Sequence, residues 1–187
     1  MNADAYLGLG ANLGNPKDTF EKALGIVANF AKIKKVSRLY KSAPFGFPDQ
    51  PSFINAAVKI NTKLSPQELL LKLQEVEETL GKKVIRANGP RVIDIDLLLY
   101  GDQIIETKEL SLPHPGILER DFVLLPLLDL NSKLMHPAWG LKTLKSAISG
   151  LQEKFIGVNP EDWNYKTGFS PCHSSSSKPE GCRRREE

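Results

Sequence analysis

The chain has few cysteines and no long apolar run. Its 187 residues include two cysteines, Cys172 and Cys182, both outside the apparent core, so no disulfide framework supports the fold. No stretch approaches the roughly 18 consecutive apolar residues of a membrane-spanning helix, and the first residues lack the charged and apolar regions of a signal peptide. These absences predict a cytoplasmic protein with no membrane partner.

An excess of charge of one sign is also missing. Lysine and arginine number 25 against 22 aspartates and glutamates, and the two signs are interspersed, so we expect no nucleic-acid partner. With 41% hydrophobic residues the chain can build one core, which we place in residues 1–157. Residues 158–187 contain four consecutive serines and no apolar period, which predicts a disordered tail.

Apolar periodicity and capping residues predict the main elements. Strands are expected at residues 6–10, 33–40 and 53–61, with a fourth after Pro90. One helix follows Asn15 and reaches about residue 30, and a second begins at a capping box of Ser65 and Glu68 and ends at Gly81. The order β, α, β, β, α, β is that of a ferredoxin-like split βαβ fold of class α+β. Helices would cover one face of an antiparallel sheet, and a ligand cleft would lie on the other.

The fourth strand carries two aspartates, Asp94 and Asp96, two positions apart. In an extended strand, residues i and i+2 point to the same face, so both carboxylates lie opposite Ile95 and Leu97. At roughly 6.6 Å apart, two unit charges repel by about 2 to 3 kcal/mol at an effective dielectric of 20. Mg²⁺, bound by one or two carboxylates with phosphate oxygens and water, would remove this repulsion. The alternative is a solvent-facing strand whose polar positions happen to be aspartates, although aspartate is disfavoured in strands.

Basic side chains flank the aspartates in sequence and would supply countercharge to a triphosphate. They are Lys82, Lys83, Arg86, Arg91, His114 and Arg120. Each lysine alone is more simply explained as a solvated surface charge. If the strand begins at Arg91, this side chain points away from the aspartates unless the turn at Gly89 and Pro90 reorients it. His114 lies between two prolines in a stiff loop, which favours a phosphate contact over an ordinary surface position.

A loop rich in proline and phenylalanine, with the sequence APFGFPDQPS, precedes the third strand. Aromatic faces in such a loop can stack on a flat heteroaromatic ligand, and an amide such as Asn55 can hydrogen-bond to the edge of that ligand. The alternative is a loop whose phenylalanines plug the end of the core, and composition alone favours it. Glu77 falls near the apolar stripe of the second helix and needs a partner, for which a structural salt bridge is favoured over a ligand hydroxyl.

The first strand runs into the sequence GLGANLG. Its glycines at positions 8, 10 and 14 are spaced one residue too far for a dinucleotide-binding fingerprint, and no Walker A pattern occurs in the chain. A Rossmann or P-loop enzyme is therefore not expected. The glycines fit better as a close approach of backbone to a ligand, with Asn12 offering hydrogen bonds.

Four motifs in this order resemble those of the 6-hydroxymethyl-7,8-dihydropterin pyrophosphokinase family. They are GxNxG after the first strand, PxGxxxQPxFxN in the proline-rich loop, GPRxIDIDLLLYG in the fourth strand and LPHPxxxxRxFVLxPL beyond it, and they lie within residues 5–151. The resemblance implies a ferredoxin-like fold, a monomer and two Mg²⁺ ions. It also implies transfer of the pyrophosphoryl group of ATP to the hydroxymethyl oxygen of the pterin, with release of AMP, in folate biosynthesis.

The resemblance assigns roles to individual residues. Asp94 and Asp96 would hold both magnesium ions, and Asp96 could also accept or steer the hydroxyl proton. Nucleotide contacts would come from Gln74, Glu77, Arg91, His114 and Arg120, and the catalytic set would comprise Asp96, Arg91, Arg120 and Lys82. The pterin pocket would comprise Gly10, Ser42, Pro44, Phe45, Phe53, Asn55 and Phe122, with Phe53 and Phe122 on either side of the ring.

Two positions depart from the family pattern. Asn88 stands where the family often has tryptophan, which would remove a stacking cover over the nucleotide. Lys82 replaces an arginine and would lose the planar, bidentate grip on phosphate. Two other functions compete with the kinase: a ferredoxin-like RNA-binding module, against which the missing RNP-type motif argues, and a metal-dependent phosphohydrolase that uses the same aspartates.

Overall fold

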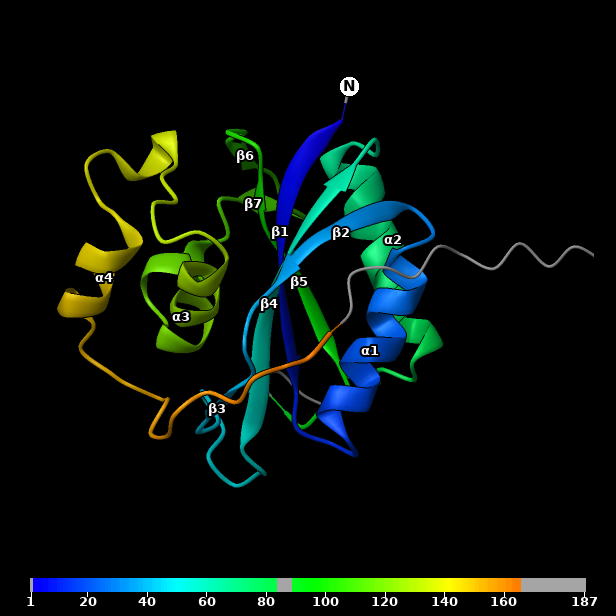
Figure 1. The fold of residues 1–187 in the computed structure, drawn as a ribbon, viewed down its shortest axis with the longest axis vertical. Helices are drawn as coiled ribbons and strands as arrows, with labels where there is room; N and C mark the ends of the chain where they lie inside the picture. Colours follow the sequence, from blue (N-terminus) through cyan, green and yellow to red (C-terminus); the bar gives the residue numbers. More distant parts are fainter. Residues whose placement is uncertain (1, 84–88, 166–187) are drawn as a thin grey trace, which may run out of the picture.

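The computed structural model describes residues 2–83 and 89–165, and an antiparallel sheet lies at its centre (Figure 1). The first part of the chain forms β1 (Ala3–Ala11), α1 (Pro16–Val27), β2 (Ala31–Val36), β3 (Tyr40–Ser42), β4 (Phe53–Thr62), α2 (Pro66–Thr79) and β5 (Asp94–Tyr100). The strands lie in the order β2, β4, β1, β5, with β3 paired to β4, and each of these pairings is antiparallel. This is the predicted α+β, ferredoxin-like arrangement.

The second part of the chain adds a small hairpin and further helices. They are β6 (Ile105–Glu106), β7 (Ser111–Leu112), the 3₁₀ helix η1 (Pro115–Leu118), α3 (Asp121–Leu130), the 3₁₀ helix η2 (Pro137–Trp139) and α4 (Leu144–Gly150). Helices α1 and α2 lie on one side of the sheet, and α3 and α4 lie on the other (Figure 1). The hairpin of β6 and β7 was not predicted, because strands of two residues show no readable alternation.

The predicted capping residues begin both helices of the ferredoxin-like unit. The Asn15 side chain accepts from the backbone N–H of Asp18 at 3.4 Å. Ser65 Oγ accepts from the N–H of Glu68 at 3.3 Å, and the Glu68 carboxylate accepts from the N–H of Ser65 at 2.8 Å, which completes the capping box. Helix α2 ends just before Gly81, whose φ of 85° lies in the left-handed region that favours glycine.

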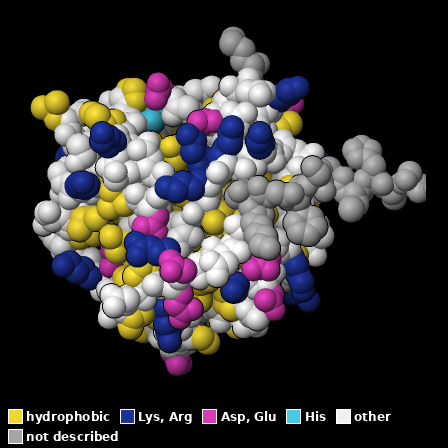
Figure 2. Space-filling model, viewed as in Figure 1, with side chains coloured by type: hydrophobic (Ala, Val, Ile, Leu, Met, Phe, Trp, Pro, Cys, Tyr) yellow, Lys and Arg dark blue, Asp and Glu magenta, His cyan; other side chains and the backbone are white. Residues whose placement is uncertain are grey.

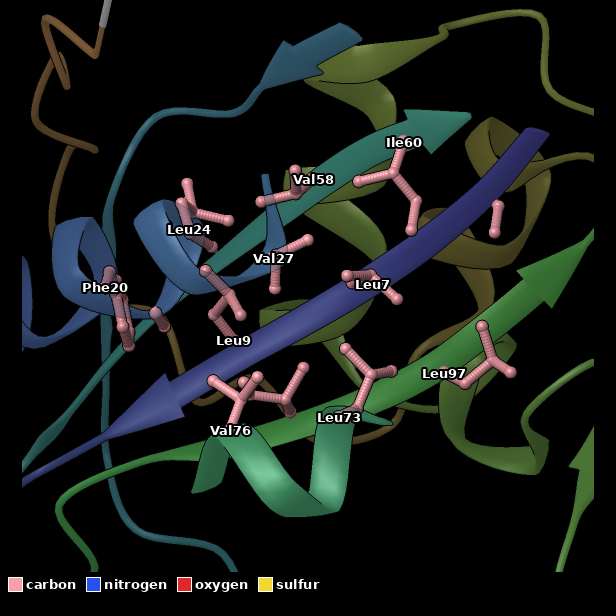
Figure 3. Packing of buried hydrophobic residues seen from close by; sticks show 14 of the residues in the cluster. Leu7, Leu9, Phe20, Leu24, Val27, Val58, Ile60, Leu73, Val76 and Leu97 are labelled. Atoms are coloured by element: carbon pink, nitrogen blue, oxygen red, sulfur yellow. The ribbon is translucent and has the colours of Figure 1, made fainter. Parts of the chain in front are cut away.

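The main core lies between the sheet and the helix pair α1 and α2. Leu7 and Leu9 of β1 point toward Phe20 and Leu24 of α1 and toward Leu73 of α2 (Figure 3). All five side chains are at most 3% exposed. Burying a side chain of this kind contributes roughly 1.5–3 kcal/mol, so this face holds β1 firmly in the centre of the sheet.

The opposite face of the sheet is free only in part, whereas the sequence predicted helices on one face alone. Tyr6 of β1 and Ala57 of β4 pack with Leu124 of α3 in a second apolar cluster. Helix α3, DFVLLPLLDL, is apolar on nearly every side and therefore buries itself against this face. The ligand cleft is consequently confined to the end of the sheet where β1 carries Gly8 and Gly10.

Residues 152–165, here called the C-terminal strap, cross from α4 past β3 to α1 (Figure 1). Leu39 and Glu161 exchange two backbone hydrogen bonds of 2.8 and 2.9 Å. Trp163 is 6% exposed and packs on Phe20 with ring centres 5.9 Å apart. Residues 158–165 of the strap therefore pack on the domain, beyond the predicted boundary at residue 157.

The rest of the predicted tail, including Cys172, His173 and Cys182, lies outside the described residues. Within residues 2–83 and 89–165, no helix is both long enough and apolar enough to cross a bilayer. On the face shown in Figure 2, basic and acidic side chains are mixed, in keeping with the balanced composition.

Candidate active site

The sheet register places two glycines of β1 beside the two aspartates of β5. Gly10 pairs with Asp94 of β5 and, on its other side, with Asn55 of β4, and Gly8 pairs with Asp96. Directly paired residues point to the same face, and glycine has no side chain, so bare backbone adjoins both carboxylates. A Cβ atom at Gly10 would meet Asn55 Oδ1 at 3.6 Å and fill this space. The predicted close backbone approach therefore forms the floor of a cleft.

Most of the predicted site residues line this cleft. They are Gly10, Ser42, Phe45, Phe53, Asn55, Arg91, Asp94, Asp96, His114, Arg120 and Phe122. Four predicted residues, Pro44, Gln74, Glu77 and Lys82, are not among its lining residues in the described part of the chain. Gly8, one of the glycines expected to approach a ligand, also lines the cleft. Leu98 and Val123 line it without having been predicted, because aliphatic side chains give no chemical signal in a sequence.

The two aspartates share the cleft face, as predicted, but have different surroundings. Asp94 accepts from Lys82 at 2.6 Å and from Arg91 at 3.0 Å. Within the described residues the Asp96 carboxylate has no hydrogen-bond or ion-pair partner. Asp96 is exposed on the cleft face, yet desolvation by the protein around the cleft, with the negative charges of Asp94 and Glu77, raises its pKa to about 7.

Glu77 forms the predicted structural salt bridge. It is 6% exposed, lies 2.8 Å from Lys82, and accepts a hydrogen bond from the backbone N–H of Ile95. Burial raises the pKa of Glu77, because these contacts only partly offset the desolvation. Burial alone would lower the pKa of Lys82, but hydrogen bonds to Asp94 and Glu77 outweigh it, and the net pKa is raised. Lys82 therefore stays charged between two carboxylates.

Arg91 points into the cleft because it precedes β5, which begins at Asp94. Two hydrogen bonds from Asn12 fix the backbone of Arg91. The side-chain Oδ1 of Asn12 accepts from the N–H of Arg91 at 2.8 Å, and the backbone N–H of Asn12 donates to the carbonyl of Arg91 at 3.1 Å. The guanidinium then lies 5.3 Å from the centre of the Phe53 ring. The strand parity that would have turned Arg91 away does not apply, and Asn12 supplies the reorientation that the Gly-Pro turn was expected to give.

His114 lines the cleft, and one of its ring nitrogens is engaged by the backbone. Its Nδ1 accepts from the N–H of Gly116 at 3.1 Å, so in the neutral ring the proton resides on Nε2. Burial, reinforced by the positive charge of Arg120, lowers the pKa of His114 and favours this neutral form. Nε2–H is thus a candidate donor to an anionic ligand.

A second cavity adjoins the cleft at the edge of the sheet. It is lined by Leu70, Ile95, Asp96, Leu97, Lys108, Glu109, Leu110, Ser111, His114 and Pro115. Asp96 and His114 line both cavities, so the two spaces are neighbours. The contribution of β7 and its preceding turn was missed, because the hairpin itself was not predicted. Gln74 is exposed one helical turn after Leu70 on α2.

The aspartate pair provides two protein ligands for a metal. No group of three or more histidine, cysteine, aspartate or glutamate side chains with metal-binding geometry occurs among the described residues. A metal at Asp94 and Asp96 would therefore complete its shell with oxygens of a ligand or water. Arg86 and Asn88 lie outside the described residues.

A sequence model of one family, described as 7,8-dihydro-6-hydroxymethylpterin-pyrophosphokinase (HPPK), matches residues 6–132. Two bacterial relatives are named 2-amino-4-hydroxy-6-hydroxymethyldihydropteridine pyrophosphokinase. That of Aquifex aeolicus is 44% identical over 137 residues, which cover 73% of this chain and 86% of the relative. That of Haemophilus influenzae is 41% identical over 158 residues, which cover 83% of this chain and 98% of the relative.

Longer proteins match as well. The folic acid synthesis protein fol1 of Pneumocystis carinii is 45% identical over 159 residues, and the chain spans 20% of that protein. The crystal structure of wild-type Plasmodium falciparum HPPK-DHPS has a TM-score of 0.65 at 16% identity, over 80% of this chain and 45% of that one. The structural likeness supports the fold, and the family model spans most of β1 and all of β4 and β5, which build the cleft. The chain therefore belongs to the 7,8-dihydro-6-hydroxymethylpterin-pyrophosphokinase family.

Proposed function

We propose that this chain transfers the pyrophosphoryl group of ATP to the hydroxymethyl oxygen of 6-hydroxymethyl-7,8-dihydropterin, forming the pterin diphosphate and AMP in folate biosynthesis. The observation that carries the proposal is one cleft in which paired carboxylates lie between cationic side chains and aromatic rings. Membership of the pyrophosphokinase family supports the same reaction.

The pterin would occupy the aromatic end of the cleft. Phe53 and Phe122 line this end and offer flat faces for stacking. Asn55 is 7% exposed, and its Nδ2 donates to Ser42 Oγ at 2.9 Å, which fixes the orientation of the amide. Its Oδ1 faces the bare backbone of Gly10 and can accept a hydrogen bond from the edge of the pterin.

The nucleotide would lie across β5. Arg91, Arg120 and His114 would contact the phosphates, because all three line the cleft beside the aspartates. The base would enter the adjoining cavity, where Leu70 and Leu110 provide apolar contacts and Lys108 provides a polar one. Gln74, exposed one turn after Leu70, would contact the nucleotide from α2.

We assign two Mg²⁺ ions to Asp94 and Asp96. The donors fit a hard cation: both are carboxylates on one face, and Asp96 has no protein cation paired to it among the described residues. Bound there, magnesium would neutralise phosphate charge and help to orient the transferred group.

The protein itself would contribute mainly by aligning the two substrates and neutralising phosphate charge, because the nucleophile is an ordinary alcohol. Asp96 would accept or steer the hydroxyl proton. Lys82, held 2.6 Å from Asp94, would add positive charge beside the phosphates. Glu77 would act by holding Lys82 rather than by touching the nucleotide. From the family resemblance we further propose that the chain acts as a cytoplasmic monomer.

The decisive experiment incubates the protein with ATP and Mg²⁺, with and without the hydroxymethyl dihydropterin, and follows AMP and inorganic phosphate. AMP that appears only with the pterin supports the proposal. Phosphate release without pterin would instead indicate a phosphohydrolase. No reaction, together with binding of single-stranded RNA, would indicate a binding module.

A further inference from the structure

Three phenylalanine rings pack together beside the cleft. Phe155 of the C-terminal strap contacts Phe45, with ring centres 5.7 Å apart and planes at 70°, and Phe122, at 5.5 Å and 79°. Phe45 and Phe122 are themselves 6.4 Å apart. Such edge-to-face pairs are attractive and fix ring orientation. Phe45 and Phe122 line the cleft, whereas Phe155 is not among its lining residues in the described chain and supports both rings from outside.

The backbone of Phe155 is fixed on two sides. Its carbonyl accepts from the N–H of Ala43 at 2.8 Å, just after β3. Its N–H and that of Ile156 both donate to Oδ2 of Asp121, at 2.8 and 3.0 Å. Asp121 is 4% exposed and directly precedes Phe122 in α3. The strap is therefore tied to both segments that carry the rings of the aromatic wall.

We propose that Phe155 is a positioning residue that sets the orientation of Phe45 and Phe122 and thereby the fit of the pterin ring. This inference rests on the proposed function, since it concerns the same cleft. The strap lies beyond the residues matched by the family model, so the support comes from the geometry of this chain. Without the Phe155 ring, each wall ring loses an edge contact, and the pterin must order both rings when it binds.

Loss of the Phe155 ring should weaken binding of the pterin more than binding of ATP. Among the described residues, no hydrogen bond, ion pair or ring contact joins Phe155 to Asp94, Arg91 or His114. These three residues are assigned to the nucleotide end of the cleft. Arg120 lies over Phe45, so a smaller effect on ATP is expected through this one contact.

The test compares Phe155→Ala, Phe155→Leu and the control Val158→Ala, which truncates a strap side chain that is 57% exposed. We expect Phe155→Ala to raise the KM for the pterin by about tenfold, the loss of roughly one aromatic pair, and the KM for ATP by less than about threefold. Phe155→Leu should have a KM for the pterin close to that of the wild type, and Val158→Ala should match the wild type. Equal changes in both KM values, or no change, would overturn the assignment.

Direct binding separates this inference from the proposed reaction. Titration with the hydroxymethyl pterin, followed by its fluorescence, should show weaker binding by Phe155→Ala than by wild type, with the fold checked by circular dichroism. If wild type binds the pterin and Phe155→Ala binds it less well, yet no AMP forms, the proposed reaction is wrong and the role of Phe155 stands. If wild type forms AMP and both proteins bind the pterin equally, the role of Phe155 is wrong. If wild type neither binds the pterin nor forms AMP with it, both are wrong.

A second variant tests how the strap is held. Asp121→Ala removes the acceptor of both strap N–H groups and should change the pterin KM in the same direction as Phe155→Ala. Asp121→Asn keeps one acceptor oxygen and should have a KM for the pterin close to that of the wild type. If Asp121→Ala leaves the pterin KM at the wild-type value, the carboxylate does not position Phe155.

Discussion

The guanidinium of Arg120 lies 4.4 Å from the centre of the Phe45 ring. A cation over an aromatic face is attracted by the ring quadrupole, and a flat guanidinium also stacks on the ring. This contact joins a residue assigned to the phosphates with a residue assigned to the pterin wall. The two ends of the cleft are thus linked by a direct side-chain contact.

Arg120→Lys should lower kcat/KM for ATP by about tenfold or more, because lysine keeps the charge but loses the planar fork and the stacking. Steady-state kinetics at constant ionic strength measure this. Arg38→Lys is the matched control, since the Arg38 guanidinium lies 5.7 Å from the centre of the Tyr40 ring and does not line the cleft. Similar losses in the two variants would contradict the phosphate role of Arg120.

Asp96→Asn should lower kcat by about 1,000-fold, because the amide is a poor magnesium ligand and cannot accept the hydroxyl proton. Circular dichroism should show an unchanged fold. Asp102→Asn, an exposed aspartate just after β5, should retain wild-type turnover. Turnover by Asp96→Asn within about tenfold of the wild type would contradict both roles.

The raised pKa of Asp96 gives a pH dependence of stability in the absence of magnesium. Its pKa is about 7 in the folded protein against an ordinary value of 3.8, so the folded state favours the protonated form. Ionising Asp96 therefore costs stability, and this contribution decreases as the pH rises from about 4 to about 7. Thermal unfolding in EDTA should show Asp96→Asn gaining stability over the wild type as the pH rises. A difference that does not depend on pH would contradict the raised pKa.

The affinity for magnesium should also depend on the ionisation of Asp96. Because the ion and the proton compete for the same carboxylate, the affinity for Mg²⁺ with a non-hydrolysable ATP analogue should increase with pH up to about 7. Calorimetric titrations at about pH 6 and about pH 8 measure the difference. An affinity that is the same at both pH values would indicate that Asp96 is not a ligand.

Glu77→Ala should lower the free energy of unfolding by about 2 kcal/mol or more, because it leaves Lys82 and the N–H of Ile95 without this buried acceptor. Urea denaturation measures the change. Glu78→Ala removes an exposed neighbour on the same helix and should change stability by less than about 0.5 kcal/mol. Equal stability of the two variants would argue against the salt bridge.

Features determined by a short segment could be predicted from the sequence. The capping box of Ser65 and Glu68 is one, and the common face of Asp94 and Asp96 is another, because each depends on residues within one helix or strand. The direction of Arg91 could not be predicted. It depends on Asn12, which lies 79 residues earlier in the chain and meets Arg91 only after β1 and β5 have paired.

The strap and the second cavity were missed for a related reason. Trp163 is buried by Phe20 of α1, and the polar residues around it show no period, because single contacts rather than a helix or strand hold them. Likewise, Lys108 and Leu110 come to line the same cavity as Leu70 of α2 only through the tertiary fold. Composition therefore predicted disorder up to the chain end, although the structure packs the strap through residue 165.

The alternation in β5 also guards against an error in folding. Ile95 and Leu97, which alternate with the aspartates, are 5% and 3% exposed. Slippage of β5 by one residue along β1 would carry Asp94 and Asp96 into the interior beneath α2 and push both aliphatic side chains into water. An unpaired ion in that interior is strongly unfavourable. The two carboxylates of the cleft therefore also specify the pairing of β5 with β1, because the cost of burying them makes the shifted register unstable.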